Sequence, residues 1–330
     1  MSIFRIIKSI LHHIPGYYRV VNFVCNRENW RVLMANDVYR HFCFHEHPRY
    51  DKKYNISICG IFKNEASFLR EWITYHEIIG VEHFWLYNNN SSDNYQEILQ
   101  PFIDRGLVTL IDWPYDQGQI SAYHDFYEHY RHQTQWYTFL DIDEFFVPKY
   151  EMSLLDWLKH SGLDRFPALL IYWRMFGTSG KMHHNYEKLV IEQYHACWEH
   201  LYNVGKCLIN SDYEIAEFNA ATHHLPLMIV HCLGQKILIR PFNMYGRSVC
   251  FINDERTEDD SKRTIQINHY WSKAWDIYDK KRKMTDVYFK DNPKQNMSYF
   301  YRHEDKNIST DYTITKFIIR LKLKLSGERK

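Results

Sequence analysis

The middle of the chain alternates between apolar runs and segments in which apolar residues recur every three or four positions. The apolar runs are bounded by turn-forming residues and predict buried strands at 55–62, 81–87, 107–113 and 136–142. The helically spaced segments predict helices at 66–79, 95–105 and 121–133. Gly80 and Gly106 follow the first two as stop signals. This alternation predicts an α/β fold with a mainly parallel central sheet and helices on both faces.

After Pro148 the pattern is less regular. The weaker patterns predict a helix at 154–158, a strand at 168–173, extended segments at 189–194 and 237–239, and a polar helix at 272–290. Strict alternation over 319–325 leaves both a strand and a helix open for 314–325.

Both ends of the chain combine apolar and basic residues. The first sixteen residues are amphipathic at helical spacing, and the first 27 contain no acidic residue. Two interpretations stay open for them: a helix docked on the body, or an interfacial helix on anionic lipid. Residues 314–325 are likewise basic without an acid. We divide the chain into an N-terminal extension (1–50), a central domain (51–290) and a basic tail (291–330) that is a candidate membrane-surface segment.

Composition narrows the class of protein. Lys plus Arg number 41 against 40 for Asp plus Glu, a balance that argues against a protein that coats nucleic acid. With 45% hydrophobic and 25% charged residues, the chain is not disordered throughout. Seven scattered Cys without a Cys-x-x-Cys pair fit neither a disulfide framework nor a zinc ribbon, so we expect a reducing compartment. No apolar stretch reaches the length of a membrane span.

The sharpest chemical signal is the run Phe-Leu-Asp-Ile-Asp-Glu-Phe-Phe at 139–146. On a strand, Asp141 and Asp143 would project to the same side, while Leu140 and Ile142 pack into the sheet. Two neighbouring carboxylates are typical of a site for Mg²⁺ or Mn²⁺ together with a phosphate-bearing ligand. The alternative is a pair of capping acids at the end of the strand.

Several further motifs follow one another between 55 and 282. They are 60–65 (Gly-Ile-Phe-Lys-Asn-Glu), 69–76 (Leu-Arg-Glu-Trp-Ile-Thr-Tyr-His), the run 80–94, the acidic run 139–146, 173–177 (Trp-Arg-Met-Phe-Gly) and 268–270 (Asn-His-Tyr). With these motifs in this order, the chain resembles glycosyltransferase family 92, formerly called domain of unknown function 23. The resemblance implies a GT-A-like, Rossmann-like fold, a nucleotide-sugar donor, and Mn²⁺ or Mg²⁺ at Asp141 and Asp143.

The resemblance also implies a donor-binding set. Its members are Lys63, Asn64, Glu65, Asn88, Asn90, Asp93, Gln119, Tyr123 and Asp141. Residues 63–65 follow the first strand, where the nucleotide binds in this fold. In similar enzymes an acid in the loop at 88–94 reads the uracil ring. The alternative for that loop is an Asn/Ser/Asp turn that holds its own backbone.

On the other side of the site, His269 would join Asp141 and Asp143 at the metal or the diphosphate; the alternative is an ordinary buried imidazole. The family positions on the acceptor side are Trp173, Gly177 and His224. We assign the general base to Glu192, because a carboxylate inside a strand-like run is expected to face solvent or a site. Here Gln-Tyr-His stands at 193–195, where the family pattern is basic.

The predicted function is metal-dependent, inverting transfer of a hexose, galactose being the family's best-known case, from a UDP-sugar to a glycan hydroxyl. We expect a lipid-linked glycan acceptor in lipopolysaccharide or capsule assembly, contact with an anionic membrane surface, and no nucleic acid. The expected location is the bacterial cytoplasm, on the inner face of the plasma membrane. Alternatives are a non-catalytic sugar- or nucleotide-binding relative and a metal-dependent nucleotidyltransferase or phosphohydrolase.

Overall fold

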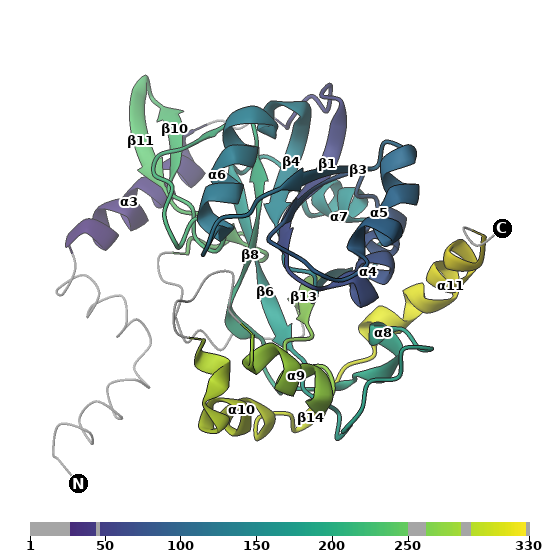
Figure 1. Ribbon diagram of the computed structural model, residues 1–330. Helices are drawn as coiled ribbons and strands as arrows, with labels where there is room; N and C mark the ends of the chain where they lie inside the picture. The colour runs from purple at the N-terminus through teal and green to yellow at the C-terminus, as the bar shows by residue number, and fades with distance from the viewer. Residues whose placement is uncertain (1–26, 44–46, 250–261, 285–291, 328–330) are drawn as a thin grey trace, which may run out of the picture.

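A mixed sheet runs through the body of the protein (Figure 1). The computed structural model describes residues 27–43, 47–249, 262–284 and 292–327. The predicted helix at 1–16 lies outside the described residues. The strands of the sheet, in spatial order, are β3 (Val108–Asp112), β2 (His83–Asn88), β1 (Tyr54–Phe62), β4 (Thr134–Phe139), β8 (Tyr202–Asn210), β6 (Ala168–Met175), β13 (Ile265–His269) and β5 (Glu144–Pro148), with β12 (Phe242–Asn243) beside β6. The first four are parallel, as are β6 with β13 and β12, whereas β4–β8, β8–β6 and β13–β5 are antiparallel.

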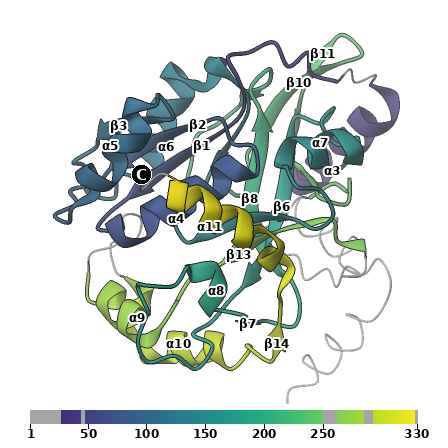
Figure 2. The ribbon, with the colours of Figure 1, turned by 90° about the vertical axis from the view of Figure 1, so that its right-hand side faces the viewer.

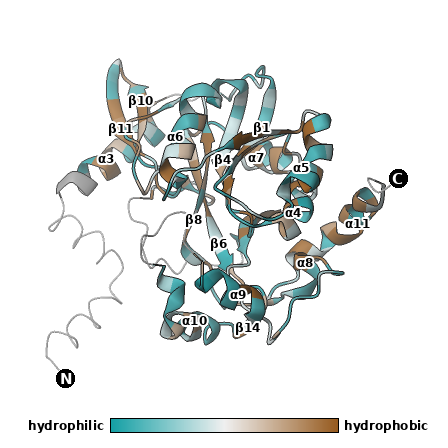
Figure 3. Cartoon of the chain, in the orientation of Figure 1, coloured by the Kyte–Doolittle hydropathy of each residue, from teal (hydrophilic) through white to brown (hydrophobic). Residues whose placement is uncertain are grey.

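Helices cover both faces of the sheet, as predicted. They are α4 (Ala66–Ile78), α5 (Tyr95–Asp104), α6 (Gln119–His129) and α7 (Leu154–Ser161). Trp72 of α4 packs on Phe84 of β2, while Phe126 of α6 packs on the next strand residue, Trp85. Consecutive strand residues face opposite sides, so α4 and α6 lie on opposite faces. Figure 3 shows the hydrophobic character of the central strand β1. The α/β fold is therefore confirmed.

The second half of the chain adds smaller elements. These are α8 (Val190–Gln193), β7 (Ala196–Cys197), β9 (Glu214–Ile215), β10 (Met228–Cys232), β11 (Gln235–Ile239), α9 (Trp275–Arg282), α10 (Met297–Glu304) and β14 (Ser309–Thr310). Short 3-10 turns cover Arg131–Gln133, Pro293–Gln295 and Thr313–Phe317. In Figure 1, α8, α9, α10 and β14 gather below the ends of β6 and β13. They form a lower layer next to the carboxyl edge of the sheet.

Two sequence-based boundaries need correction. Residues 189–194 are not extended, because Val190–Gln193 form the helical turn α8. The buried Glu71 carboxylate accepts the N–H groups of Val190 and Ile191 at 2.7 and 3.1 Å, and these bonds stabilise the start of a helix. The polar helix expected at 272–290 begins only at Trp275.

The C-terminal segment, for which the sequence left both a strand and a helix open, forms a helix, α11 (Ile318–Gly327). It lies along α4 (Figure 2), with Leu321 fully buried. Lys324 pairs with Glu77 at 2.7 Å. Ile319 and Leu323 remain exposed. This segment is therefore docked on the body, and no helix among the described residues is long and apolar enough to cross a bilayer.

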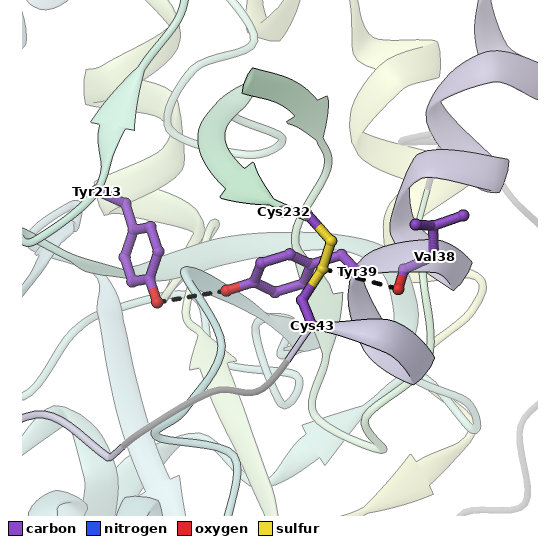
Figure 4. Close-up of a disulfide and its surroundings, with 5 residues drawn as sticks. All are labelled: Val38, Tyr39, Cys43, Tyr213 and Cys232. Atoms are coloured by element: carbon purple, nitrogen blue, oxygen red, sulfur yellow. Dashed lines mark hydrogen bonds between the residues drawn. A yellow bond between two sulfur atoms is a disulfide. The ribbon is translucent and has the colours of Figure 1, made fainter. Parts of the chain in front are cut away.

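A disulfide joins α3 (Arg27–Phe42) to the β10–β11 hairpin (Figure 4). It links Cys43 to Cys232, whose Cα atoms lie 5.6 Å apart. Next to it, the side chain of Asn36 exchanges two 2.9 Å hydrogen bonds with the backbone of Arg240. The scattered cysteines predicted no disulfide framework, yet this pair is bonded across a sequence separation of 189 residues, and no local Cys spacing indicates it.

Candidate active site

The carboxyl ends of β4, β6 and β13 meet beside the start of β5, and Asp141 and Asp143 lie in the turn between β4 and β5. The two carboxylates were predicted on a strand, but β4 ends at Phe139. The N–H of Glu144 bonds to the Asp141 carbonyl at 3.1 Å, which closes the turn. Leu140 is buried, as expected. The turn, rather than strand alternation, brings both acids to the edge of the sheet where α/β proteins bind ligands.

Asp141 is bound to a buried ammonium. Its Oδ2 accepts from Lys206 Nζ at 2.9 Å, and its Oδ1 has longer contacts with Gln119 Nε2 (3.4 Å) and Tyr123 Oη (3.5 Å). Burial alone would raise the pKa of Asp141, but the Lys206 ammonium outweighs it and lowers this pKa. Two predicted donor-side residues, Gln119 and Tyr123, therefore do lie at the first aspartate.

Asp143 is surrounded by basic groups. Its Oδ2 lies 3.1 Å from Lys281 Nζ and 4.0 Å from Lys273 Nζ, and its Oδ1 lies 3.6 Å from His269 Nε2. Burial opposes ionisation, but Lys281 and Lys273 hold the pKa of Asp143 well below its usual value. The carboxylate therefore remains charged across the neutral range.

Glu65, the last residue of the predicted loop after β1, reaches the same cluster. Its Oε1 lies 2.8 Å from Lys281 Nζ, so Lys281 bridges Glu65 and Asp143. Burial would lower the pKa of Lys281, but these two carboxylates raise it. Lys273, which has weaker anionic contacts, has its pKa lowered by burial and by Lys281 to about 8.

An aromatic wall borders the charged groups. The ring of Trp173 lies 4.6 Å from that of His269 and 5.2 Å from that of His224. A bulge between Tyr172 and Trp173 shifts the register of β6 against β8. Opposite the bulge stands Gly205, where a Cβ would meet the Ile171 carbonyl at 1.8 Å. The predicted acceptor-side residues Trp173 and His224 are thus brought next to the predicted metal ligand His269.

The atoms at this site that could coordinate a metal suit a cation only if a second ligand, such as a phosphate, completes its coordination. Asp141 Oδ1, Asp143 Oδ1 and His269 Nε2 are the atoms that the lysines leave for a metal. Among the described residues, no three His, Cys, Asp or Glu side chains converge into a ready-made metal site. Mg²⁺ and Mn²⁺ are commonly held by one or two carboxylates plus phosphate oxygens and water. The residues present fit that arrangement, and a closed all-protein site is not formed.

The loop residues assigned to the nucleotide bond mainly to other residues of these two loops and of the elements that follow them. Asn64 Oδ1 accepts from the N–H of Ser92 at 2.7 Å, and Asp93 Oδ2 accepts from the N–H of Ala66 at 2.8 Å. Asn88 donates to Tyr95 Oη and to Asp112 Oδ1, Asn90 is exposed, and Lys63 is half-buried. These contacts lock the loop after β2 onto the loop after β1. Within the second loop, Asn88 Oδ1 accepts from the Ser91 N–H at 3.0 Å, a bond of the kind expected for a turn that holds its own backbone.

Two further assigned residues contact other elements. Glu192 was selected as the base because it stood in an apparent strand, but it lies on α8, accepts from the Leu189 N–H at 3.1 Å and pairs with Lys322 of α11. Gly177 packs against α10 and the residues after it, where a Cβ would meet Asn307 Nδ2 at 1.8 Å. The structure joins neither residue to the aspartate cluster by a contact.

Three lysines of the site escaped the sequence reasoning. Lys206 stands inside the apolar run of β8, and an isolated charge in a buried strand was the available signal. Lys273 comes four residues after His269, and Lys281 eight residues later on α9. Their role becomes visible only when β8, β13 and α9 are seen to meet at the two aspartates.

Comparison with known proteins gives a family and several relatives. The sequence pattern of glycosyltransferase family 92 matches residues 52–316. A family 92 protein of Oryza sativa subsp. japonica is 35% identical over 141 residues, which cover 41% of this chain and 24% of the rice protein. A galactan beta-1,4-galactosyltransferase of Arabidopsis thaliana, GALS3, is 35% identical over 108 residues, covering 28% of this chain and 21% of that protein. The matched segments thus span about a quarter or less of these relatives.

A solved structure with a similar arrangement is the mannosyltransferase from Pyrobaculum calidifontis in complex with GDP-Man and Mn²⁺. Its TM-score is 0.31 at 14% identity, over 50% of this chain and 47% of that chain.

Proposed function

The chain belongs to glycosyltransferase family 92, and we propose that it transfers a hexose from a UDP-sugar to a glycan hydroxyl. In this reaction the bond between the anomeric carbon and the diphosphate oxygen breaks, and the diphosphate leaves with the electron pair. The acceptor oxygen bonds to the anomeric carbon, and its proton passes to a base. The assignment of that base to Glu192 stays a prediction.

The observation that carries the proposal is the environment of Asp141 and Asp143 at the carboxyl edge of the sheet. Two ionised carboxylates there are combined with the buried ammonium groups of Lys206 and Lys273 and the partly buried one of Lys281. Such a cluster can hold a group whose negative charge increases as it departs. Stabilisation of charge that develops in the transition state commonly contributes more to an enzyme's rate than any other effect.

The residues at the two aspartates would suit a divalent cation that binds together with a diphosphate. Asp141, Asp143 and His269 would hold Mn²⁺ or Mg²⁺, which supplies positive charge to the leaving group when bound. Lys206 and Lys281 keep the two aspartates ionised and oriented. Trp173 offers an indole face near His269 on which a sugar ring can stack.

Galactose is the first candidate for the sugar. The support comes from the segments shared with two plant proteins named galactan beta-1,4-galactosyltransferases, at 35% and 32% identity. A beta product from an alpha-linked UDP-sugar requires inversion at the anomeric carbon. An acceptor in lipopolysaccharide or capsule assembly, and a location on the inner face of the bacterial plasma membrane, stay predictions from the sequence.

The test is a donor screen with the purified full chain. UDP-galactose, UDP-glucose and UDP-N-acetylglucosamine are incubated with β-1,4-galactan oligosaccharides in Mn²⁺ or in EDTA, and product is followed by mass spectrometry. We expect galactosyl transfer with Mn²⁺, and Asp143→Asn should reduce the rate by about 100-fold or more, the usual effect of losing a charge-stabilising group.

Asp104→Asn is the matched control, because this exposed carboxylate on α5 lies away from the site and accepts a 2.7 Å hydrogen bond from its helix neighbour Gln100. It should leave the rate unchanged. Absence of nucleotide binding by calorimetry, together with absence of transfer from every donor, would refute the transferase and favour the sugar-binding relative.

A further inference from the structure

The last residue of β13 and the segment that follows it contain several buried polar atoms without a hydrogen-bond partner in the described part of the protein. They are Nδ1 of His269, Nε1 of Trp271, Oγ of Ser272 and Nζ of Lys273. Buried polar groups in proteins are nearly always hydrogen-bonded, because each unsatisfied one costs free energy. Four in five consecutive residues indicate that the segment is shaped for a ligand.

Among these four groups, the charged ammonium of Lys273 has the highest free-energy cost of burial without a hydrogen-bond partner. Its side chain is only 1% exposed, and its ammonium has no hydrogen-bond partner among the described residues. The nearest carboxylate oxygen in its ion pair, on Asp143, lies 4.0 Å away, and the ring of Phe68 lies 4.4 Å below the ammonium. Asp143 is in turn bound more closely by Lys281, at 3.1 Å. The charge of Lys273 is therefore only partly compensated.

The backbone at Lys273 is strained as well. Its φ of 53° lies in the left-handed region, which a residue with a Cβ adopts at a cost. Such strain persists where the surrounding structure or a function maintains it. Strain and an unsatisfied ammonium are independent observations on one residue, and both are hard to explain by stability alone.

We propose that Lys273, with Ser272 Oγ beside it, binds the diphosphate of the nucleotide donor. A diphosphate offers several oxygens with negative charge, which satisfy an ammonium and a hydroxyl together. The position fits, because Lys273 adjoins Asp143, the residue at which the diphosphate-bound cation is proposed. This inference rests on the proposed function for the identity of the ligand as a nucleotide, but the anion site itself does not.

The experiment is calorimetric titration of UDP, uridine and inorganic pyrophosphate, in Mn²⁺ and in EDTA. It compares the wild type with Lys273→Met, which keeps the length of the side chain and removes the charge. We expect UDP and pyrophosphate to bind at least about tenfold more weakly to the variant, the effect of one charged hydrogen bond. Uridine should bind equally to both proteins. Lys280→Met, which removes an exposed charge from α9, is the matched control and should bind like the wild type.

A second readout separates ligand binding from a structural role. Removing an unsatisfied buried charge should raise the melting temperature of the free protein, whereas removing a stabilising ion pair would lower it. If Lys273→Met does not fold, Lys273→Gln carries the same comparison.

The outcomes are distinguishable from those of the donor screen. Equal UDP affinity in wild type and Lys273→Met overturns the Lys273 proposal and leaves the transferase intact. Pyrophosphate binding that depends on Lys273, without any preference for UDP, supports the anion site and refutes the UDP donor. A wild type that binds none of the three compounds overturns both.

Discussion

The buried pair between Lys206 and Glu144 gives the sharpest prediction about stability. Lys206 Nζ lies 3.8 Å from Glu144 Oε1, and the two side chains are 1% and 0% exposed. The Lys206→Met variant keeps the length of the side chain but removes its charge. Glu144 then loses the one ammonium that pairs with it among the described residues, and water cannot replace that partner.

The magnitude follows from the distance and the burial. Two unit charges 3.8 Å apart interact by about 4 kcal/mol at an effective dielectric constant of about 20. Removing one partner of a buried ion pair costs about 3–5 kcal/mol, in the same range. We therefore expect Lys206→Met to lose about 4 kcal/mol of unfolding free energy near pH 8.

The loss should depend on pH. Burial holds the pKa of Glu144 well above its usual value, and removal of Lys206 will raise that pKa further. A carboxyl whose pKa is higher in the folded state than in the unfolded state binds more protons when folded, so stability falls as pH rises above the unfolded value of about 4.3. The deficit of Lys206→Met should be small near pH 5 and should grow towards pH 8.

Urea unfolding followed by tryptophan fluorescence at pH 5 and pH 8 measures both quantities. The double variant Lys206→Met/Glu144→Gln should recover most of the loss at pH 8, because a neutral pair leaves no buried charge. Lys236→Met, at an exposed position on β11, is the matched control. A deficit that is equal at both pH values, or that the double variant does not relieve, would show that the pair is not responsible.

Two other predictions concern packing and covalent structure. Gly177→Ala places a Cβ 2.5 Å from Glu304 Oε1 and closer still to Asn307, so we expect the unfolding free energy to fall by about 1–3 kcal/mol, measured by thermal unfolding. Gly327→Ala, whose Cβ meets no atom within 4 Å, should leave stability unchanged. Equal melting temperatures of the two variants would contradict the predicted clash at Gly177. Thiol trapping in intact cells should find Cys43 and Cys232 protected, and Cys232→Ser should cost about 2–4 kcal/mol under oxidising conditions only. Alkylation of both cysteines without prior reduction would refute the disulfide and favour the reducing compartment expected from the sequence.

The sequence was sufficient for elements whose pattern is local. The strands and helices from β1 to β4 follow from apolar runs and helical spacing, because their inward faces are buried against the sheet. It was insufficient where a distant group decides the local structure. Residues 190–193 turn into a helix because Glu71, 119 residues earlier, accepts their free N–H groups. Cys43 and Cys232 meet across a separation of 189 residues.

The same limit applies to the candidate site. Asp141 and Asp143 were found because two acids in one short motif are visible in the sequence. Three different parts of the chain supply the lysines: Lys206 is on β8, Lys273 follows β13, and Lys281 is on α9. The sequence around each of them gives no indication of its contact with the aspartates. The fold brings the three lysines together, so no short sequence motif identifies them, whereas one short motif contains both aspartates.

The charge balance of the site explains why a cation and a diphosphate would bind together. Four carboxyl groups, those of Glu65, Asp141, Asp143 and Glu144, face three ammonium groups, so the net charge of the free site is small in either protonation state of Glu144. A divalent cation alone would add positive charge beside three lysines, and a diphosphate alone would add negative charge beside two ionised aspartates. Bound jointly, their charges would nearly cancel, with Asp141 and Asp143 as the residues that would hold the cation and Lys273 as the one that would bind the diphosphate. Under the proposed function, the lysines would therefore complement a metal at this site and would not replace it.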